Sequence, residues 1–534
     1  MSRPWRLAGG LVLAGLMLVL APAAQASFKV LDRLPNGVER IKYRIGPLDV
    51  APGQNKIRNR TVVGSERPAV DGWIVRMKPD LVWHGGSREG HAPSTEKVMF
   101  HHGVFINLSR TDATTGGRFE RFMGSGEEKT IMQFPRPFAY RYKASDHWLI
   151  NEMIHNLSPQ HMTLDISYTI DFIPDTSPAA DGLRAVRPVW MDVENGSGYP
   201  VFDVHKGEGG GDGVLTYPDE VPNAYPPGVH KNFWTVDRDG VLVSTAAHVH
   251  TGGLAGDLYL HRDGAEYAGP RCSKRPTARQ RRACRAKAPN VVGDRVHLFR
   301  SGMKYYEPAG PVSWDMSAKG TPDGWRVAVH KGDRLEVTAD YETKIGSWYE
   351  SMGIMVVYMA DGGGGKDPYA TKVDYPGEVT HGHLPENSVH GGKPTDLPDP
   401  RKLPGASATG DPFLIAGFAY GDATILPGGG GTVPLVKQGQ SLTFKISDSD
   451  RANQIWHSLT SCAAPCNRST GIAYPLPDGK YQFDSGQMGN LNGNGSPPTV
   501  PWTSWKTPND LPPGTYTFFC RIHFQMRGAF RVVK

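Results

Sequence analysis

Hydrophobic and polar residues alternate along several short segments of the chain. From Met162 to Phe172 the even-numbered positions are apolar and the odd-numbered ones are Thr, Asp or Ser. The same spacing of two recurs at 335–341 and at 442–446. In a β-strand this spacing turns one face toward a core and the other toward polar surroundings. Because no segment shows the pattern of a long, capped amphipathic helix, the sequence predicts an all-β protein built from antiparallel sandwiches.

Composition marks the expected domain boundaries. Residues 174–188 are rich in Pro and Ala, and residues 361–410 combine a run of four glycines with many prolines and few apolar side chains. Stretches of this kind join domains more often than they form cores. We therefore expect a half-domain at 27–180, a second half-domain at 181–360, a linker at 361–410 and a last domain at 411–534.

The first 26 residues have the pattern of a secretion signal. Two arginines precede an apolar run at 11–20, and Ala24-Gln25-Ala26 offers small residues to a signal peptidase. The run is short for a membrane span, which disfavours the alternative of an uncleaved anchor. We expect cleavage near Ser27, a periplasmic or secreted location, and no membrane span in the mature protein.

The charge of the chain is only mildly basic. Lys and Arg total 59 against 53 Asp and Glu, a net charge of +6 that does not indicate a nucleic-acid partner. One segment, Arg271–Lys287, holds eight basic residues and no acidic one. We interpret it as a solvated loop and not as a docking site for an acidic partner.

Five cysteines in an exported protein predict disulfides and one free thiol. Cys272 and Cys284 bracket a short loop, and Cys462 and Cys466 are four positions apart. We expect these two pairs to be bonded. Cys520 is then left over, and a bond to a metal would explain an unpaired thiol in an oxidising compartment.

The residues around Cys520 have the spacing of a type 1 (blue) copper site. Such a site takes one thiolate, two imidazoles and a weak axial thioether. Cys520, His523 and Met526 form a Cys-x2-His-x2-Met loop near the C-terminus, and His457 follows the apolar segment 442–446. These four residues are the predicted ligands of one copper ion.

This loop resembles that of the amicyanin kind of cupredoxin, in which Cys-x2-His-x2-Met is followed by Arg-Gly, here Arg527-Gly528. The resemblance implies a cupredoxin β-sandwich over residues 411–534. Cupredoxins of this kind often place Pro beside the ligand His, whereas this chain has Ile522 and Phe524.

Three further groups of residues stand out before residue 360. His248 and His250 are two apart, so on a strand both imidazoles face the same side and can bind one metal ion. His101 and His102 are adjacent and could share a metal only at a strand end or a bulge. A methionine-rich segment follows at 351–359. Each group alone is more often part of a core than a metal site.

In this order the groups resemble those of the copper type II monooxygenases, the family of peptidylglycine hydroxylase and dopamine β-monooxygenase. The family carries His-His and a later His in a first half-domain, then His-x-His and a Met in a second. His155 matches the later His, and Met352 matches the Met. The segment 72–79 before the His-His pair also has a counterpart in the family.

The resemblance implies two jelly-roll-like β-sandwich half-domains ahead of the cupredoxin domain, with two mononuclear coppers besides the type 1 copper. His101, His102 and His155 would hold an electron-transfer copper. His248, His250 and Met352 would hold the copper that activates oxygen, and Asp257, Asp340 and Tyr341 are candidates for supporting these ligands.

The chain departs from the peptide-amidating members of the family. Ile354 and Val356 stand where those members place Asn and Tyr, and Ala246 and Ala247 stand where they carry an Arg. Amidated peptides are therefore not expected as substrates. His381, His383 and His390 lie in the predicted linker and are read as ordinary polar residues.

Two functions compete. The first is an exported copper monooxygenase that hydroxylates C–H bonds with O2 and carries its own blue-copper electron donor. Its partners would be a small organic substrate and a redox protein or a small reductant. The alternative is a non-catalytic copper protein for electron transfer or copper storage.

Overall fold

The computed structural model describes residues 28–34, 37–197, 199–264, 277–280, 291–292, 295–306, 310–373, 375–382, 397–408, 410–426, 428, 431–467, 483–489 and 502–534. The protein is nearly all β, as the alternating pattern predicted. The predicted signal at 1–26, the pair Cys272 and Cys284, and His383 and His390 lie outside the described residues. Within the described part, no helix is long and apolar enough to span a bilayer.

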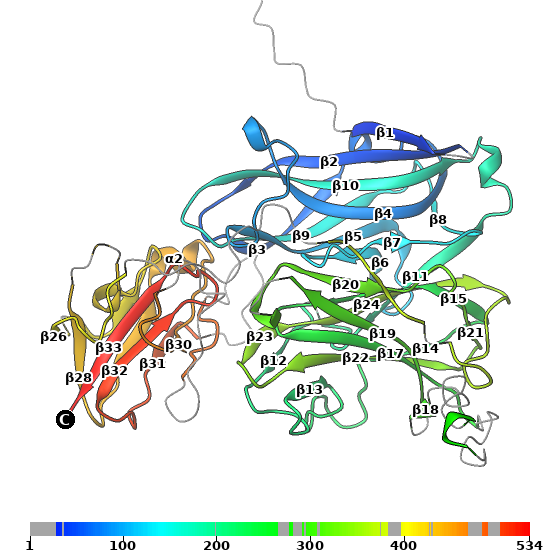
Figure 1. Ribbon diagram of the computed structural model, residues 1–534. Helices are drawn as coiled ribbons and strands as arrows, with labels where there is room; N and C mark the ends of the chain where they lie inside the picture. The colour runs from blue at the N-terminus through cyan, green and yellow to red at the C-terminus, as the bar shows by residue number, and fades with distance from the viewer. Residues whose placement is uncertain are drawn as a thin grey trace, which may run out of the picture.

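The first sandwich comprises two facing sheets between residues 28 and 174 (Figure 1). One sheet has the order β1 (Phe28–Leu34), β2 (Val38–Val50), β10 (Met162–Pro174), β4 (Gly72–Trp83) and β8 (Phe138–Tyr142), and β7 (Met132–Gln133) also pairs with β4. The other has the order β3 (Asn55–Val62), β9 (Trp148–Asn156), β5 (Val98–Thr111) and β6 (Phe119–Ser125). The apolar side chains of β10 at 162–172 are all buried, so this predicted strand is confirmed.

The second sandwich is continuous with the first. β8 pairs in parallel with β11 (Arg184–Asp192), which extends the first sheet through β24 (Gly353–Asp361), β15 (Gly240–Ser244) and β21 (Val327–Val329), while β16 (Ala247–Val249) also pairs with β24. The facing sheet has the order β13 (Val214–Tyr217), β22 (Arg334–Glu342), β17 (Gly253–His261), β19 (Arg295–Tyr305), β20 (Met316–Gly320) and β25 (Glu378–Val379). β14 (Phe233–Thr235) pairs with β22, β18 (Val291–Val292) pairs with β19, and β12 (Phe202–Val204) pairs with β23 (Trp348–Ser351).

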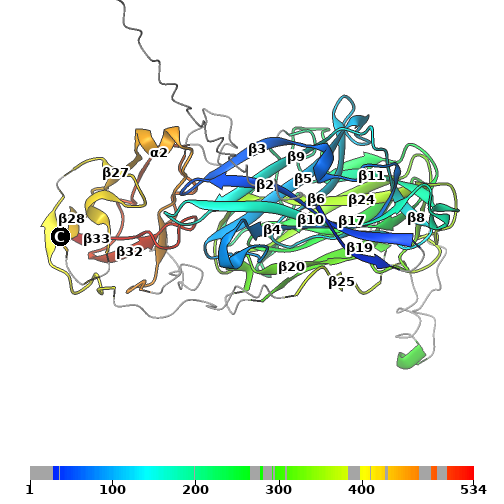
Figure 2. The ribbon, with the colours of Figure 1, turned by 90° about the horizontal axis from the view of Figure 1, so that it is seen from above.

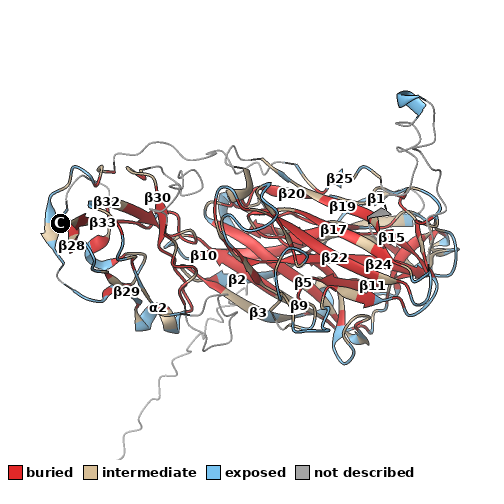
Figure 3. Ribbon diagram, turned by 90° about the horizontal axis from the view of Figure 1, so that it is seen from below, coloured by how far each residue is buried: buried red, intermediate tan, exposed pale blue. Residues whose placement is uncertain are grey.

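Strand β24 separates two apolar cores. Ile354, Val356 and Tyr358 belong to the core of the first sandwich, and the alternate residues Met355, Val357 and Met359 belong to the core of the second. Every residue of β24 before Asp361 is therefore buried, which explains the continuous apolar run at 353–360 (Figure 3). Met352, just before this strand, packs with the first core.

The C-terminal sandwich has its own core. One sheet has the order β26 (Gly405–Ser407), β28 (Val433–Lys437), β33 (Arg527–Val533), β32 (Gly514–Phe519) and β30 (Thr460–Cys462), and the other has β27 (Phe413–Ile415), β29 (Thr443–Ile446) and β31 (Ser504–Lys506). The only described α-helix in this part of the chain is the short α2 (Asp448–Ala452). Strand β26 and, earlier, β25 lie within the range 361–410 that composition assigned to a linker.

The C-terminal sandwich packs against one end of the other two (Figures 1 and 2). An apolar cluster crosses this boundary, and its members are Met99, Leu157, Trp314, Met316, Cys462, Cys466, Phe519 and Phe524. In addition, the side-chain amide Nε2 of Gln525 donates to the backbone oxygen of Leu157 at 3.0 Å. Two of the segments that reach this boundary, 99–102 and 519–526, carry predicted metal ligands.

Candidate metal centres

The loop between β32 and β33 brings Cys520, His523 and Met526 together. The backbone N–H of Met526 donates to the oxygen of His523 at 2.8 Å, and the N–H of Cys520 donates to the oxygen of Met526 at 3.1 Å. This tight turn lies against His457, which follows α2 and pairs with Met488 in an isolated antiparallel β-bridge. Local sequence spacing therefore sets three of the four predicted ligands, and only His457 depends on the tertiary fold.

The side chains in this group approach metal-ligand spacing. Nδ1 of His457 and Nδ1 of His523 are 3.3 Å apart, and Sγ of Cys520 is 3.8 Å from Nδ1 of His523. Among the described residues, His457, Cys520 and His523 are the one set of three His, Cys, Asp or Glu whose ligand atoms all lie within 4.8 Å of one another. Met526 is 1% exposed and packs in the same core.

The disulfide pattern fits this grouping. Cys462 and Cys466 form a disulfide, as expected, and Cys520 is free and buried. Its sulfur accepts hydrogen bonds from the backbone N–H groups of Ser458 and His523, both at 3.3 Å. Two donors aimed at one sulfur stabilise its thiolate form, which is the form that binds a metal.

Electrostatics also favour the thiolate. Although burial opposes it, hydrogen bonds from His457 and from the backbone lower the pKa of Cys520. Burial lowers the pKa of the His457 imidazole, but its hydrogen bonds to Asp450 and Cys520 outweigh burial and raise this pKa above its usual value. Burial and the neighbouring His457 lower the pKa of His523 well below its usual value, so this ring is neutral and able to bind a metal.

His101 and His102 lie on β5 at a bulge. The pairing of β5 with β9 shifts register between Phe100 and His102, so His101 is the extra residue of the bulge. This is the geometry that adjacent histidines need to approach one another. Their ring centroids are 5.6 Å apart, and the ring of His155 on β9 is 6.2 Å from that of His101.

His248 and His250 lie at strand β16 and are held by several polar groups. Nδ1 of His248 contacts Oε2 of Glu128 at 2.9 Å, and Nδ1 of His250 contacts the backbone oxygen of Glu350. The hydroxyl of Tyr341 accepts from the N–H groups of His250 at 3.1 Å and Met352 at 3.0 Å. Tyr341 therefore fixes the backbone beside two predicted ligands.

The other two candidate supporting residues bond elsewhere. Asp257 contacts His297 and Arg300, and Asp340 contacts Thr216 and Arg300. Glu128, which sequence reasoning missed, takes the supporting place beside His248. It is 120 positions away in the chain and lies in a turn, so no local spacing could have indicated it.

The five histidines form one group and not two separate ones. The rings of His101 and His250 lie only 4.2 Å apart, and those of His248 and His250 lie 5.1 Å apart. Trp314 packs against both His101 and His250, at 5.3 and 5.6 Å between centroids. In this arrangement the two predicted ligand sets are adjacent. Neither set holds three His, Cys, Asp or Glu ligand atoms that all lie within 4.8 Å of one another, as those of His457, Cys520 and His523 do.

Several buried imidazole atoms have no hydrogen-bond partner, and they are His102 Nδ1, His155 Nε2, His248 Nε2, His250 Nε2 and His523 Nε2. A buried polar atom without a partner costs about 1–3 kcal/mol. Burial lowers the pKa values of His102 and His155 to about 3, which leaves both rings neutral. Neutral imidazole nitrogens without partners fit a metal-binding role, and with Met352 they form the nitrogen and thioether set that suits copper.

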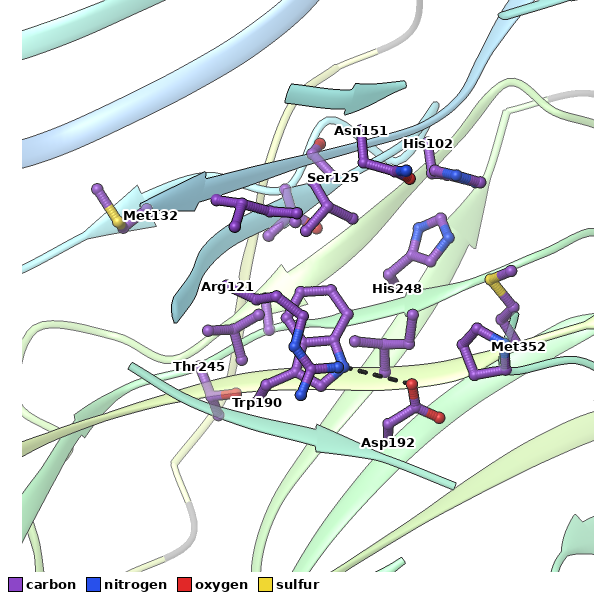
Figure 4. Close-up of a pocket in the computed structure, with 18 of the residues that line it drawn as sticks. His102, Arg121, Ser125, Met132, Asn151, Trp190, Asp192, Thr245, His248 and Met352 are labelled. Carbon is purple, nitrogen blue, oxygen red and sulfur yellow. Dashed lines mark hydrogen bonds between the residues drawn. The ribbon is translucent and has the colours of Figure 1, made fainter. Parts of the chain in front are cut away.

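A cavity of about 430 Å³ lies between the sheet of β5, β6 and β9 and the strands β11 and β24. His102, His248 and Met352 lie along its wall (Figure 4). Ala246, Ile354 and Val356 are also in the lining. The lining is mainly apolar, with polar groups that include Asp192, whose carboxylate accepts from the indole nitrogen of Trp190 at 3.3 Å (Figure 4).

A smaller cavity of about 60 Å³ lies where the C-terminal sandwich meets the histidines. Its lining includes His101, His155 and His250 from one side and Ser458, Arg521 and Ile522 from the other. Across this boundary the rings of His155 and His523 are 6.1 Å apart in an edge-to-face arrangement. The predicted blue-copper ligands therefore adjoin the predicted N-terminal ligands.

Comparison with models of known protein families and with curated proteins finds no match for this chain. The functional argument consequently rests on the residues themselves. His381, one of the three linker histidines, contacts the backbone oxygens of Met316 and Glu127 at 2.8 and 3.2 Å, which is an ordinary structural role.

Proposed function

We propose that the protein is an exported copper-dependent monooxygenase of the copper type II kind, with a blue-copper electron donor fused at its C-terminus. The observation that carries this proposal is the 430 Å³ cavity walled by His248, Met352 and His102. Its volume is that of a typical small-molecule site, and its apolar lining suits a small organic substrate. An electron carrier or storage protein has no need of such a cavity beside its metal ligands.

His248, His250 and Met352 would hold the copper, which would supply activation of O2 and insertion of one oxygen atom into a substrate C–H bond. The other oxygen atom would leave as water, with two protons and with two electrons from the reductant. The protein's own groups prepare this site. Glu128 orients His248, the oxygen of Glu350 orients His250, and Tyr341 holds the backbone of His250 and Met352. Such supporting contacts fix which ring nitrogen is free to bind the metal.

The donor role of the C-terminal sandwich is supported by its position. His523 is fully buried and its ring adjoins that of His155, so the two ligand groups face each other with no intervening strand. Fusion alone would only raise the local concentration of a tethered donor. A packed boundary with an apolar cluster instead holds the donor in one place.

The test uses the full-length protein with a Met352→Ile variant and a Met355→Ile control. Met355 is equally buried on β24 but packs in the second core, away from the cavity. We expect Met352→Ile to abolish hydroxylation and coupled O2 uptake with apolar probes such as ethylbenzene and cyclohexane, while Met355→Ile keeps both. The visible absorption of the Cys520 centre should persist in both variants and disappear in Cys520→Ser.

Metal analysis tests the copper content, and substrate-dependent O2 uptake separates the two functions. Three coppers per chain with one blue and two colourless centres agree with the proposal. Wild-type protein that binds copper only at the Cys520 group would show that the proposal is wrong and that the protein is an electron carrier. A Met352→Ile variant with full activity would overturn the assignment of His248, His250 and Met352 as the oxygen-activating site.

A further inference from the structure

Met153 lies among the histidines but has no role in the ligand sets considered so far. It is on β9, two residues before His155, and it is fully buried. Across the bulge it stands opposite His102. Its sulfur Sδ is 3.1 Å from Nδ1 of His101, and the hydroxyl of Tyr199 is 3.8 Å from the same sulfur.

The sulfur–nitrogen contact has the spacing of two atoms that share a metal ion. With bonds of about 2.0 Å to nitrogen and 2.3 Å to sulfur, ligand atoms at angles of about 90–110° lie about 3.0–3.5 Å apart. The 3.1 Å separation of Met153 Sδ and His101 Nδ1 falls in this range. Packing explains why an apolar side chain is buried here, and a hydrogen bond from Nδ1–H of His101 would hold the sulfur in this position in the metal-free protein.

We propose that Met153 Sδ is a ligand of the copper held by His101, a role that rests on the proposed function. His102 Nδ1 and His155 Nε2, both buried and without hydrogen-bond partners, complete the set of available donors. A thioether is a soft ligand that favours Cu(I) over Cu(II). The all-histidine centre that the family resemblance implies therefore becomes a centre with one sulfur.

The sulfur ligand also lies on the side of the donor. Met153 belongs to the same apolar cluster as the core of the C-terminal sandwich, whose members include Cys520 and Met526. His101, by contrast, faces His250 at 4.2 Å between ring centroids. A ligand pair made of Met153 and His101 thus spans the space between the C-terminal sandwich and the His248–His250 pair.

The experiment is a Cu(I) competition titration of full-length protein with bathocuproine disulfonate. Met153→Leu removes the sulfur and keeps the volume of the side chain, a change that cores tolerate well. Met99→Leu is the matched control, because Met99 is also buried beside these histidines and belongs to the apolar cluster at the boundary. We expect one Cu(I) in Met153→Leu to bind at least about tenfold more weakly than in the wild type, with Met99→Leu unchanged.

A second readout is the reduction potential of the colourless coppers, followed by electron paramagnetic resonance during a redox titration. Met153→Leu should lower the potential of one of them and leave the blue centre unchanged. Equal Cu(I) affinity and equal potentials in Met153→Leu and Met99→Leu overturn the Met153 assignment and leave the proposed function standing. Wild-type protein that binds no copper besides the blue one overturns both.

Discussion

Arg521 offers a direct test of how the C-terminal sandwich is held. Its guanidinium donates to the backbone oxygen of Ser347, and it lies over the rings of Trp348 at 5.0 Å and Tyr349 at 5.7 Å. It also donates to Oδ2 of Asp484 within its own sandwich at 3.1 Å. Arg521, next to Cys520 in the chain, therefore contacts residues 347–349, which lead into Met352.

The magnitude follows from these contacts. A hydrogen bond from a charged group contributes about 1.5–3 kcal/mol, and a cation–π contact contributes about 0.5–2 kcal/mol. Because contacts of one side chain are not additive, Arg521→Leu should weaken docking by about 2–4 kcal/mol. At about 1.4 kcal/mol for each factor of ten, the ratio of docked to undocked protein falls roughly 30- to 1,000-fold.

Hydrogen–deuterium exchange provides the assay. We expect faster exchange in Arg521→Leu at residues 347–352 and at residues 155–157, which lie on the far side of the boundary. Asp484→Asn is the control, since it removes the negative charge from the contact within the C-terminal sandwich and keeps the contacts with Ser347 and Trp348. Near-ultraviolet circular dichroism checks that each variant remains folded. Unchanged exchange at 347–352, or the same change in Asp484→Asn, would refute the docking role of Arg521.

Two further predictions concern the wall of the larger cavity. A Cβ atom at Gly124 would lie 3.2 Å from the ring of Trp190. The substitution Gly124→Val should therefore narrow the cavity and lower the turnover of bulky apolar substrates by about tenfold or more. Competition between linear and branched substrates measures this change. The second prediction concerns Asp112. Burial raises the pKa of its carboxyl group, but the hydrogen bond from Arg121 outweighs burial and holds this pKa at about 2, below the value of about 3.9 in an unfolded chain. Asp112 therefore contributes about 2.5 kcal/mol of stability. This contribution is complete above about pH 5 and is lost as the pH falls through about 2, so the melting-temperature difference between wild type and Asp112→Asn should shrink below about pH 4.

Much of the fold was accessible from the sequence because it depends on local pattern. Alternation predicted β10, and the single turn from Cys520 to Met526 carries three ligands whose spacing needs no distant contact. The i and i+2 placement of His248 and His250 is equally local, although β16 turned out to be only three residues long. The structure also supplies the bulge that adjacent histidines require.

The remainder depends on contacts that no local pattern encodes. The parallel pairing of β8 with β11 joins the first two sandwiches into one sheet, and it could not be derived from the alternation of either strand. Glu128 reaches His248 only through the tertiary fold. The resemblance implied two mononuclear coppers and left their separation open, and here the ring centroids of His101 and His250 lie 4.2 Å apart.

The packing of the C-terminal sandwich against the other two explains the two apolar residues beside His523. Ile522 and Phe524 flank His523 where the cupredoxins that this loop resembles often carry Pro, and by themselves they indicate only a changed loop. In the structure Ile522 lines the small cavity with His101 and His155, and Phe524 packs in the cluster that contains Met99 and Leu157. A freely tethered cupredoxin would expose these side chains around its ligand His, at a cost of about 1.5–3 kcal/mol each. The apolar flanks of His523 are therefore explained by a permanent boundary, one whose far side is formed by the histidines that the donor would serve.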